Sequence, residues 1–245
     1  MKVVISQPMY FPWAGFLAQM ALADVFIWLD DAQFSKGSFT NRVQVKTAQG
    51  VKWMSIPLQG KGSFRQIREL EAGRADWHRA HRALIAQALR GRPHVADALD
   101  IFDALDHSAP LCDVLVQSAE APAAAIGVLP KTRMTSTELG VEGQSWERVL
   151  SLVKAVGGTE YISGRGGLGY IDHEAFEAEG VSVRYMDYAP HPWPQDPPPF
   201  TPYVTGLDLI ASVSRDKARD HLNPATLDWR EAKAQMAKAQ AEDTT

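Results

Sequence analysis

The chain has 245 residues, of which 45% are hydrophobic and 22% charged, values ordinary for a folded globular protein. The formal net charge is −4, from 25 basic and 29 acidic residues, so the overall balance does not indicate a nucleic-acid or membrane surface. The single cysteine, Cys112, excludes an intrachain disulfide and a thiolate metal cluster, and its apolar neighbours predict a buried thiol. The apolar run at 3–5 is too short for a signal peptide, and no run reaches a transmembrane length, so a cytoplasmic location is expected.

The N-terminal stretch predicts a strand–helix–strand unit. An apolar strand at 2–6 runs into a proline turn, a helix at 12–22 follows, and a second apolar strand at 25–30 ends on two carboxylates. Two further apolar runs, at 43–46 and 52–58, flank a turn signal and predict a β-hairpin inserted after the second strand.

The remaining chain alternates helical and strand patterns. Apolar spacings of three and four predict helices over 75–90, 94–120 and 146–156, and strands are expected at 132–136, 160–163 and 181–185. A glycine-rich loop at 165–169, short helices at 172–179 and 205–212, and a proline-rich segment at 190–199 that excludes helix and central strand complete the order. The fold class predicted is α/β, a Rossmann-like parallel sheet with a β-hairpin insertion and a helical middle region. We expect one domain over 1–225, with the helical insertion at about 75–120, and a polar C-terminal helix or tail over 226–245.

The first candidate site is the turn after the first strand and the start of the next helix. Unpaired amides and the helix dipole make such a turn suitable for an anion. Gln7 is expected to hydrogen-bond a ligand, Gly15 to allow close approach to the backbone, and Tyr10 and Trp13 to line a pocket. The alternative is that the prolines shape a turn and the aromatic side chains fill the core.

The second and third candidate clusters follow the second strand. Asp30 and Asp31 are candidates for an acid, a base or a ligand at a strand end, although adjacent strand residues point to opposite faces. Lys36 and Arg42 suit a phosphate or carboxylate. Gln33 and Asn41 are candidate polar contacts beside them. Because parallel strands present their C-terminal ends at one edge, these clusters are expected to meet the first one there.

Two later segments are expected to form further walls of the same cleft. The glycine loop contributes Ser163, Gly166, Gly167 and Tyr170 as substrate-binding candidates, and the proline-rich lid contributes His191 as a candidate base and Gln195. Neither a G-x-G-x-x-G fingerprint in a βαβ unit nor a phosphate-binding P-loop motif is present, a zinc site is not favoured, and no G-x-S-x-G elbow indicates a hydrolase triad.

These pieces, in this order, resemble the WbqC-like protein family over roughly 2–222. The resemblance is carried by Gln7-Pro8, Tyr10, Pro12, Gly15-Phe16, Asp30-Asp31, Gln33-Phe34, Lys36, Asn41-Arg42, Ile56-Pro57-Leu58, Tyr161-Ile162, Gly166-Gly167, Tyr170, Asp172, Phe176, Gln195, Phe200, Pro202 and Asp208-Leu209.

The resemblance implies a place in bacterial surface-polysaccharide (O-antigen) biosynthesis. We expect a transferase that modifies an amino sugar, nucleotide-linked, by acyl or aminoacyl transfer, with Asp30 or Asp31 accepting a proton. Two alternatives stay open: a nucleotidyltransferase-like nucleotide-dependent enzyme, and a non-enzymatic carbohydrate-binding protein. The expected partner is a small sugar nucleotide, with no membrane and no nucleic acid except a charged tRNA as one possible donor. The sequence assigns neither a cofactor nor an oligomeric state, and no metal ligand is predicted.

Overall fold

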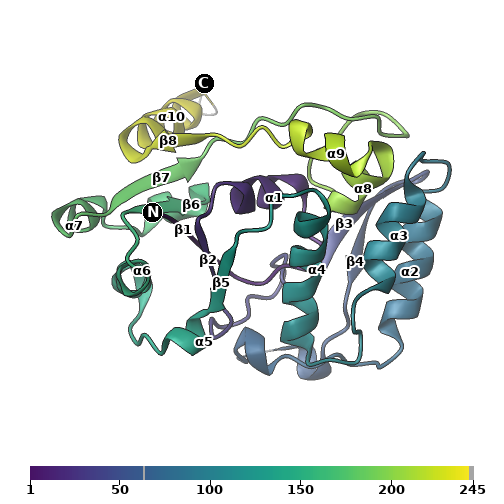
Figure 1. Cartoon of the computed structure of the whole chain (residues 1–245), viewed down its shortest axis with the longest axis horizontal. Helices are drawn as coiled ribbons and strands as arrows, with labels where there is room; N and C mark the ends of the chain where they lie inside the picture. Colours follow the sequence, from purple (N-terminus) through teal and green to yellow (C-terminus); the bar gives the residue numbers. More distant parts are fainter. Residues whose placement is uncertain (63, 243–245) are drawn as a thin grey trace.

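A computed structural model describes residues 1–62 and 64–242 of the chain. Its centre is a six-stranded sheet with the strand order β5-β2-β1-β6-β7-β8 (Figure 1). The first five strands in this order run parallel, and β8 runs antiparallel to β7. The strands are β1 Lys2–Ser6, β2 Val25–Trp28, β5 Thr132–Thr135, β6 Glu160–Ser163, β7 Ser182–Met186 and β8 Thr226–Asp228.

The order of the strands reverses at β1. The chain proceeds from β1 to β2 and β5 on one side, and then crosses to β6 and β7 on the other side. In doubly wound sheets, the crevice at such a reversal, beyond the carboxyl ends of the strands, is where ligands bind. The predicted α/β class with a Rossmann-like parallel sheet is confirmed, and its switch point lies between the ends of β1 and β6.

Two hydrophobic cores cover the two faces of the sheet. In β1, Val4 packs into one core, whereas Val3 and Ile5 pack into the other. Side chains alternate between the faces of a strand, so a strand buried on both faces must be apolar at every position. This explains the uninterrupted apolar run at the start of the chain.

Helices form the layers that cover these cores (Figure 1). One face carries a large helical layer, and the other carries smaller helices and the C-terminal helix. The helices of the large layer are α1 Ala14–Ala21, α2 Trp77–Ala88, α3 Val95–Asp103, α4 Leu111–Ala125, α8 Gly206–Ser212 and α9 Arg215–Ala218 with η4 Arg219–His221. Those of the other layer are α6 Ser145–Ala155, α7 His173–Ala178 and α10 Trp229–Glu242, with α5 Ser136–Leu139 and η3 Arg165–Gly169 at the strand ends.

The predicted hairpin is present and forms a separate two-stranded sheet. β3 (Arg42–Thr47) pairs antiparallel with β4 (Gly50–Ser55), and the short helices η1 (Gln59–Gly62) and η2 (Ile67–Glu69) follow. The amide of Thr205 donates to the carbonyl of Gln44 at 2.8 Å, so the hairpin is attached to the segment that enters α8.

The structure differs from the predicted elements in two places and specifies a third. The single helix expected over 94–120 is two helices, because Asp106 accepts a turn hydrogen bond from the Ser108 amide at 3.0 Å and Pro110, which lacks an amide hydrogen, precedes α4. The short edge strand β8 was not predicted. The polar helix or tail expected over 226–245 contains the helix α10, and Ala232 of this helix is fully buried against the sheet layer.

Candidate functional site

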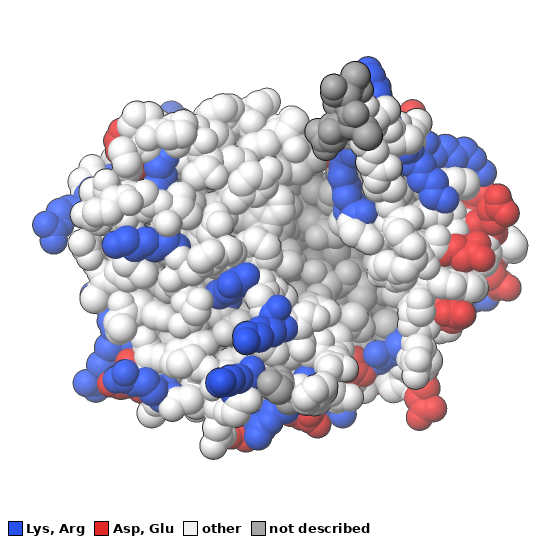
Figure 2. All heavy atoms as spheres, turned by 180° about the vertical axis from the view of Figure 1, so that it is seen from behind, with Lys and Arg blue, Asp and Glu red and all other residues white. Residues whose placement is uncertain are grey.

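A pocket of about 510 Å³ lies at the switch point of the sheet. It is lined by residues at three strand ends: Ser6 at the end of β1, Gly164 and Arg165 after β6, and Asp187 and Tyr188 after β7. Its floor is apolar, with Ile5, Met9, Phe16 and Met186. Figure 2 shows that the corresponding face of the molecule is hollowed beside the C-terminal helix. The pocket therefore occupies the position at which this type of sheet binds ligands.

Three aromatic side chains form one wall of the switch-point pocket. The ring of Trp13 meets that of Tyr188 edge to face, with centroids 5.1 Å apart, and that of Tyr203 at 5.5 Å. Tyr203 is 56% exposed at the mouth, and it reaches the pocket because Trp13 bridges to Thr205 before α8. Such a wall can stack on a sugar ring or a nucleobase.

Gly15 determines where the ring of Trp13 lies. A Cβ atom at this position would be 2.2 Å from the Trp13 ring, so any other residue would push the indole out of its place. A glycine is therefore needed here because the Trp13 side chain packs closely over the first turn of α1. It is not needed for an unusual backbone conformation.

A charged pair closes the polar side of the pocket. A guanidinium nitrogen of Arg165 donates to Asp187 Oδ1 at 3.1 Å and to Gln235 Oε1 of α10 at 2.8 Å. Both charged side chains are less than half exposed. Within the described chain, Arg165 is the one cation and Asp187 the one carboxylate that line this pocket. A guanidinium here suits a phosphate, and a carboxylate suits an amine or a hydroxyl.

The hydroxyl of Tyr188 is buried and has no hydrogen-bond partner among the described residues. Burial raises the pKa of this hydroxyl further above its ordinary value, so the group remains a protonated donor at neutral pH. A buried polar group without a partner costs free energy, which makes it a notable feature of a pocket wall.

Of the residues predicted from the first cluster, Trp13 and Gly15 line the switch-point pocket. Gln7 directly follows Ser6, and its backbone carbonyl accepts a hydrogen bond from the Ser6 hydroxyl at 3.4 Å. Tyr10 instead lies fully buried in the core, where its hydroxyl is 3.1 Å from His81 Nδ1. The alternative reading of this tyrosine, a core side chain, is the one that the structure shows.

The carboxylates of the second cluster do not lie at the switch-point pocket. Asp30 is 6% exposed and accepts from the Ser136 hydroxyl at 2.9 Å and the Thr137 amide at 3.1 Å. Asp31 accepts from the same hydroxyl at 2.7 Å and forms a two-pronged ion pair with Arg148. We call the group formed by Asp30, Asp31, Ser136, Thr137 and Arg148 the Asp30–Asp31 corner. They tie the end of β2 to α5 and α6.

The Arg148 pair also sets the proton affinity of Asp31. Burial would raise the pKa of this carboxyl, but the hydrogen bonds from Arg148 and Ser136 and the nearby guanidinium charge outweigh it and lower the pKa. Asp31 borders a different hollow of about 350 Å³, together with Arg68 and Arg148. The expectation that the clusters meet is therefore corrected: the turn after β2 is closed by α5, and of the two strands β1 and β2 it is β1 whose end opens into the switch-point pocket.

The third cluster lies on and before the hairpin. Asn41 donates from its side chain to the carbonyl of Ile56 at 2.8 Å, and Arg42 stacks over the ring of Trp53 at 4.1 Å. Gln33 and Lys36 are exposed. None of these four lines the switch-point pocket within the described residues.

The residues of the glycine loop that line the pocket are not the ones that were predicted to do so. Gly164 and Arg165 line it, whereas a Cβ atom on Gly167 would lie 2.5 Å from Ser163 Oγ, so this glycine serves packing below the loop. Gly166 has open space around it, and Tyr170 borders a separate hollow beside His173 and Trp229.

The proline-rich segment is anchored by a buried polar network. Gln195 accepts from Lys46 Nζ at 3.0 Å and donates to Asp208 Oδ1, also at 3.0 Å. Trp193 donates to the same carboxylate oxygen at 2.7 Å. Burial lowers the pKa of Lys46. His191, in contrast, is exposed at the surface and its Nδ1 pairs with the Asp220 carbonyl at 3.0 Å. These contacts hold the segment in place, and neither His191 nor Gln195 lines the switch-point pocket.

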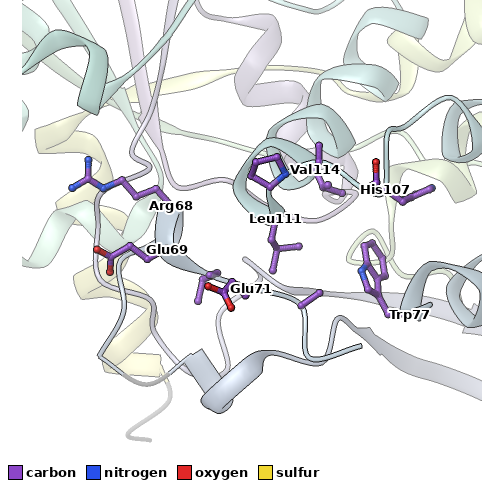
Figure 3. Close-up of a pocket in the computed structure, with 12 residues that line it drawn as sticks. Arg68, Glu69, Glu71, Trp77, His107, Leu111 and Val114 are labelled. Carbon is purple, nitrogen blue, oxygen red and sulfur yellow. The ribbon is translucent and has the colours of Figure 1, made fainter. Parts of the chain in front are cut away.

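A hollow of similar size, about 530 Å³, lies beside the start of α4 (Figure 3). Arg68 and Glu69 stand at one end, and Trp77 and His107 at the other, with Leu111 between them. Its carboxylates have partners: Glu69 accepts from the Gln66 amide at 3.0 Å, and Glu71 pairs with Arg65 at 3.6 Å. None of the predicted site residues lines it, and it is not at the strand reversal, so the switch-point pocket is the better candidate.

The pocket residues that sequence reasoning did not select include the charged and tyrosine side chains Arg165, Asp187, Tyr188 and Tyr203. Arg165 lies in the predicted glycine loop, and Asp187 and Tyr188 come shortly after the strand predicted at 181–185, so their position near a strand end is the available signal. The signal that was missing is strand order, which decides which strand ends face the reversal.

The fold and the pocket define a class: an α/β protein with a doubly wound sheet and a ligand pocket at its switch point. Residues 7–220 match the model of the WbqC-like protein family, and the chain belongs to this family. It is 30% identical over 227 residues to a protein of Mycobacterium tuberculosis (strain ATCC 25618 / H37Rv) named "Uncharacterized protein Rv1507c", covering 90% of this chain and 97% of that protein. No solved structure matches the chain. Within the described residues, no helix has the length and apolar character that a membrane span requires.

Proposed function

We propose that the chain is a transferase that binds a nucleotide-linked amino sugar in the switch-point pocket and modifies its amine by acyl or aminoacyl transfer. The observation that carries the proposal is the composition of this one pocket: an aromatic wall, one cation and one carboxylate at the strand reversal. The membership in the WbqC-like family supports a role in surface-polysaccharide biosynthesis, as the resemblance implied.

The residues of the pocket suit the parts of such a substrate. Arg165 would hold the diphosphate, since a guanidinium matches phosphate oxygens with two parallel hydrogen bonds. Trp13 and Tyr203 would stack on the base or the sugar. Asp187 would bind the ammonium and accept one of its protons, which frees the nitrogen lone pair to attack the acyl carbonyl. The acyl–oxygen or acyl–sulfur bond of the donor then breaks, and the leaving group departs with the second proton that the nitrogen loses.

This assignment moves the proposed base from the Asp30–Asp31 corner to Asp187. The carboxylates of the corner are occupied by Ser136, Thr137 and Arg148. Asp187 has a less buried environment and a partner, Arg165, that a phosphate can compete for.

The test is calorimetric titration with nucleotide-linked 2-amino sugars, their N-acetylated forms and the free nucleoside diphosphates. The free-amine sugar nucleotides should bind more tightly than the N-acetylated forms, because only an ammonium pairs with Asp187. Replacing Arg165 with Gln should weaken binding of all diphosphates by at least about 10-fold. Replacing the exposed Arg79 in the same way is the matched control and should change nothing. Absence of binding by every sugar nucleotide would refute the proposal.

A further inference from the structure

The charges of this acidic chain are segregated. Residues 32–68 contain seven Lys and Arg residues and no Asp or Glu. The other 208 residues carry all 29 carboxylates and 18 of the 25 cations. The hairpin and the loops on its two sides therefore form a positive region on a protein of net negative charge.

We call the following cations and aromatic rings on and beside the hairpin the hairpin surface: the exposed Lys36, Lys52, Trp53, Lys61 and Phe64, and the partly buried Arg42. Phe64 is 91% exposed and Trp53 is 42% exposed. The guanidinium of Arg42 lies 4.1 Å from the centroid of the Trp53 ring, and the ring of Phe39 lies 5.5 Å away. Figure 2 shows Lys and Arg side chains over this face of the molecule, beside the hollow.

We propose that the hairpin surface binds single-stranded nucleic acid. Lys36, Lys52 and Lys61 contact its backbone phosphates, and a base stacks beside the Arg42–Trp53 pair. Cations spaced around exposed aromatic rings are the arrangement by which proteins bind unpaired strands, since every base has a face that stacks and every nucleotide a phosphate. This inference does not depend on the proposed transferase activity.

Two other anionic partners fit the surface less well. A lipid membrane requires a continuous apolar face that enters the bilayer, and the exposed aromatic residues here are separate side chains on a strand and a loop. An acidic protein segment would use the cations but leave the stacked Arg42–Trp53 pair without a planar partner. The chemistry of the surface, charge together with exposed rings, favours a polynucleotide.

The hairpin is paired with the segment that leads from the mouth of the switch-point pocket into α8. Gln44 of β3 bridges to Val204, which adjoins Tyr203 at the mouth of the pocket.

The test measures fluorescence anisotropy of labelled single strands of about 12 nucleotides, one RNA and one DNA of the same sequence. We expect saturable binding that weakens by about 20-fold when salt rises from about 50 to about 200 mM, as three phosphate contacts on a single strand imply. Tighter binding of RNA and equal binding of both strands would each support the proposal. The comparison would show whether the surface prefers RNA or binds either kind of strand.

A matched pair of variants separates this surface from general electrostatics. The triple change Lys36→Ser, Lys52→Ser and Lys61→Ser should weaken binding by about 10-fold or more and reduce the salt slope by about 2. The control, Lys131→Ser, Lys217→Ser and Lys238→Ser, alters net charge by the same amount at exposed positions elsewhere and should have less than about a 2-fold effect. Trp53→Ala should weaken binding by about 10-fold without changing the salt slope.

Three results would overturn the inference. They are equal losses in the two triple variants, no saturable binding of either strand at low salt, and binding to phosphatidylserine vesicles in place of the oligonucleotides. Thermal unfolding of each variant, compared with that of the unmodified chain, shows that a loss of binding is not a loss of the fold.

Discussion

The switch-point pocket and the Asp30–Asp31 corner lie at the same edge of the same sheet, at the ends of the neighbouring strands β1 and β2. In the corner, each carboxylate is bonded by serine, threonine or arginine of the elements that follow β5. In the pocket, the polar groups include a nearly half-exposed ion pair and a hydroxyl with no partner among the described residues. A strand end is thus a binding site only where the fold leaves its polar groups open to a ligand.

The largest expected effect concerns the stability of the corner. Asp31→Ala should lower the free energy of unfolding by about 3 kcal/mol, because it leaves the largely buried Arg148 charge without its carboxylate partner. Urea denaturation measures this loss. Sugar-nucleotide affinity should stay within about 2-fold of the unmodified chain, and a loss of affinity in a folded variant would mean that the corner, not the pocket, binds the ligand.

A second test uses pH to probe the buried contact between Tyr10 and His81. Tyr10 was expected at the site, but it lies in the core against this histidine. Burial lowers the pKa of His81 from 6.5 to about 4. Between these values the unfolded chain binds a proton that the folded chain does not, so stability must fall as the pH falls through this window. From about pH 7 to about pH 4.5, the loss from this group is about 2 kcal/mol.

His81→Gln should remove that part of the pH dependence, measured by urea denaturation at each pH. Asp31, whose lowered pKa makes its contribution disappear only at more acidic pH, should remain as a separate loss below about pH 4. An unchanged slope in the His81 variant would show that the imidazole is not buried as described.

A third test alters the pocket while leaving the corner intact. Gly15→Ala should weaken sugar-nucleotide binding by about 10-fold, since the new methyl displaces the Trp13 ring. The control, Gly166→Ala, adds a methyl where space is open and should bind as the unmodified chain does. Equal affinities in the two variants would remove Trp13 from the site.

The smallest expected effect is on the stability of the Arg165 pair. Arg165→Gln should change the free energy of unfolding by less than about 1 kcal/mol, because the ion pair with Asp187 is nearly half exposed. Combined with its expected loss of diphosphate affinity, this contrasts with Asp31→Ala, which loses stability and keeps affinity. A large stability loss in the Arg165 variant would make the two regions alike.

Much of the fold could be predicted from local patterns in the sequence. The buried strand at 3–5, the hairpin and the helix over 146–156 follow from apolar periodicity, and the placement of Trp13 and Gly15 at a strand–helix junction follows from the same unit. The break between α3 and α4 depends on a three-residue Asp–Ser turn, whose signal was weaker than the apolar spacing around it.

The partners of the site residues could not be predicted. Asp30 and Ser136 are 106 residues apart, and Gln195 and Lys46 are 149 apart, so their pairing is set by tertiary packing that a linear pattern does not contain. Strand order also comes from packing, and with it the fact that β6 and β7 contribute Arg165 and Asp187 to the pocket.

The most direct test is a crystal structure of the chain with a nucleotide-linked amino sugar. We expect the ligand between Trp13 and Arg165, its diphosphate bonded to the guanidinium and its amine within hydrogen-bond distance of Asp187. A ligand bound instead beside Asp31 and Arg148, with the switch-point pocket empty, would contradict the account.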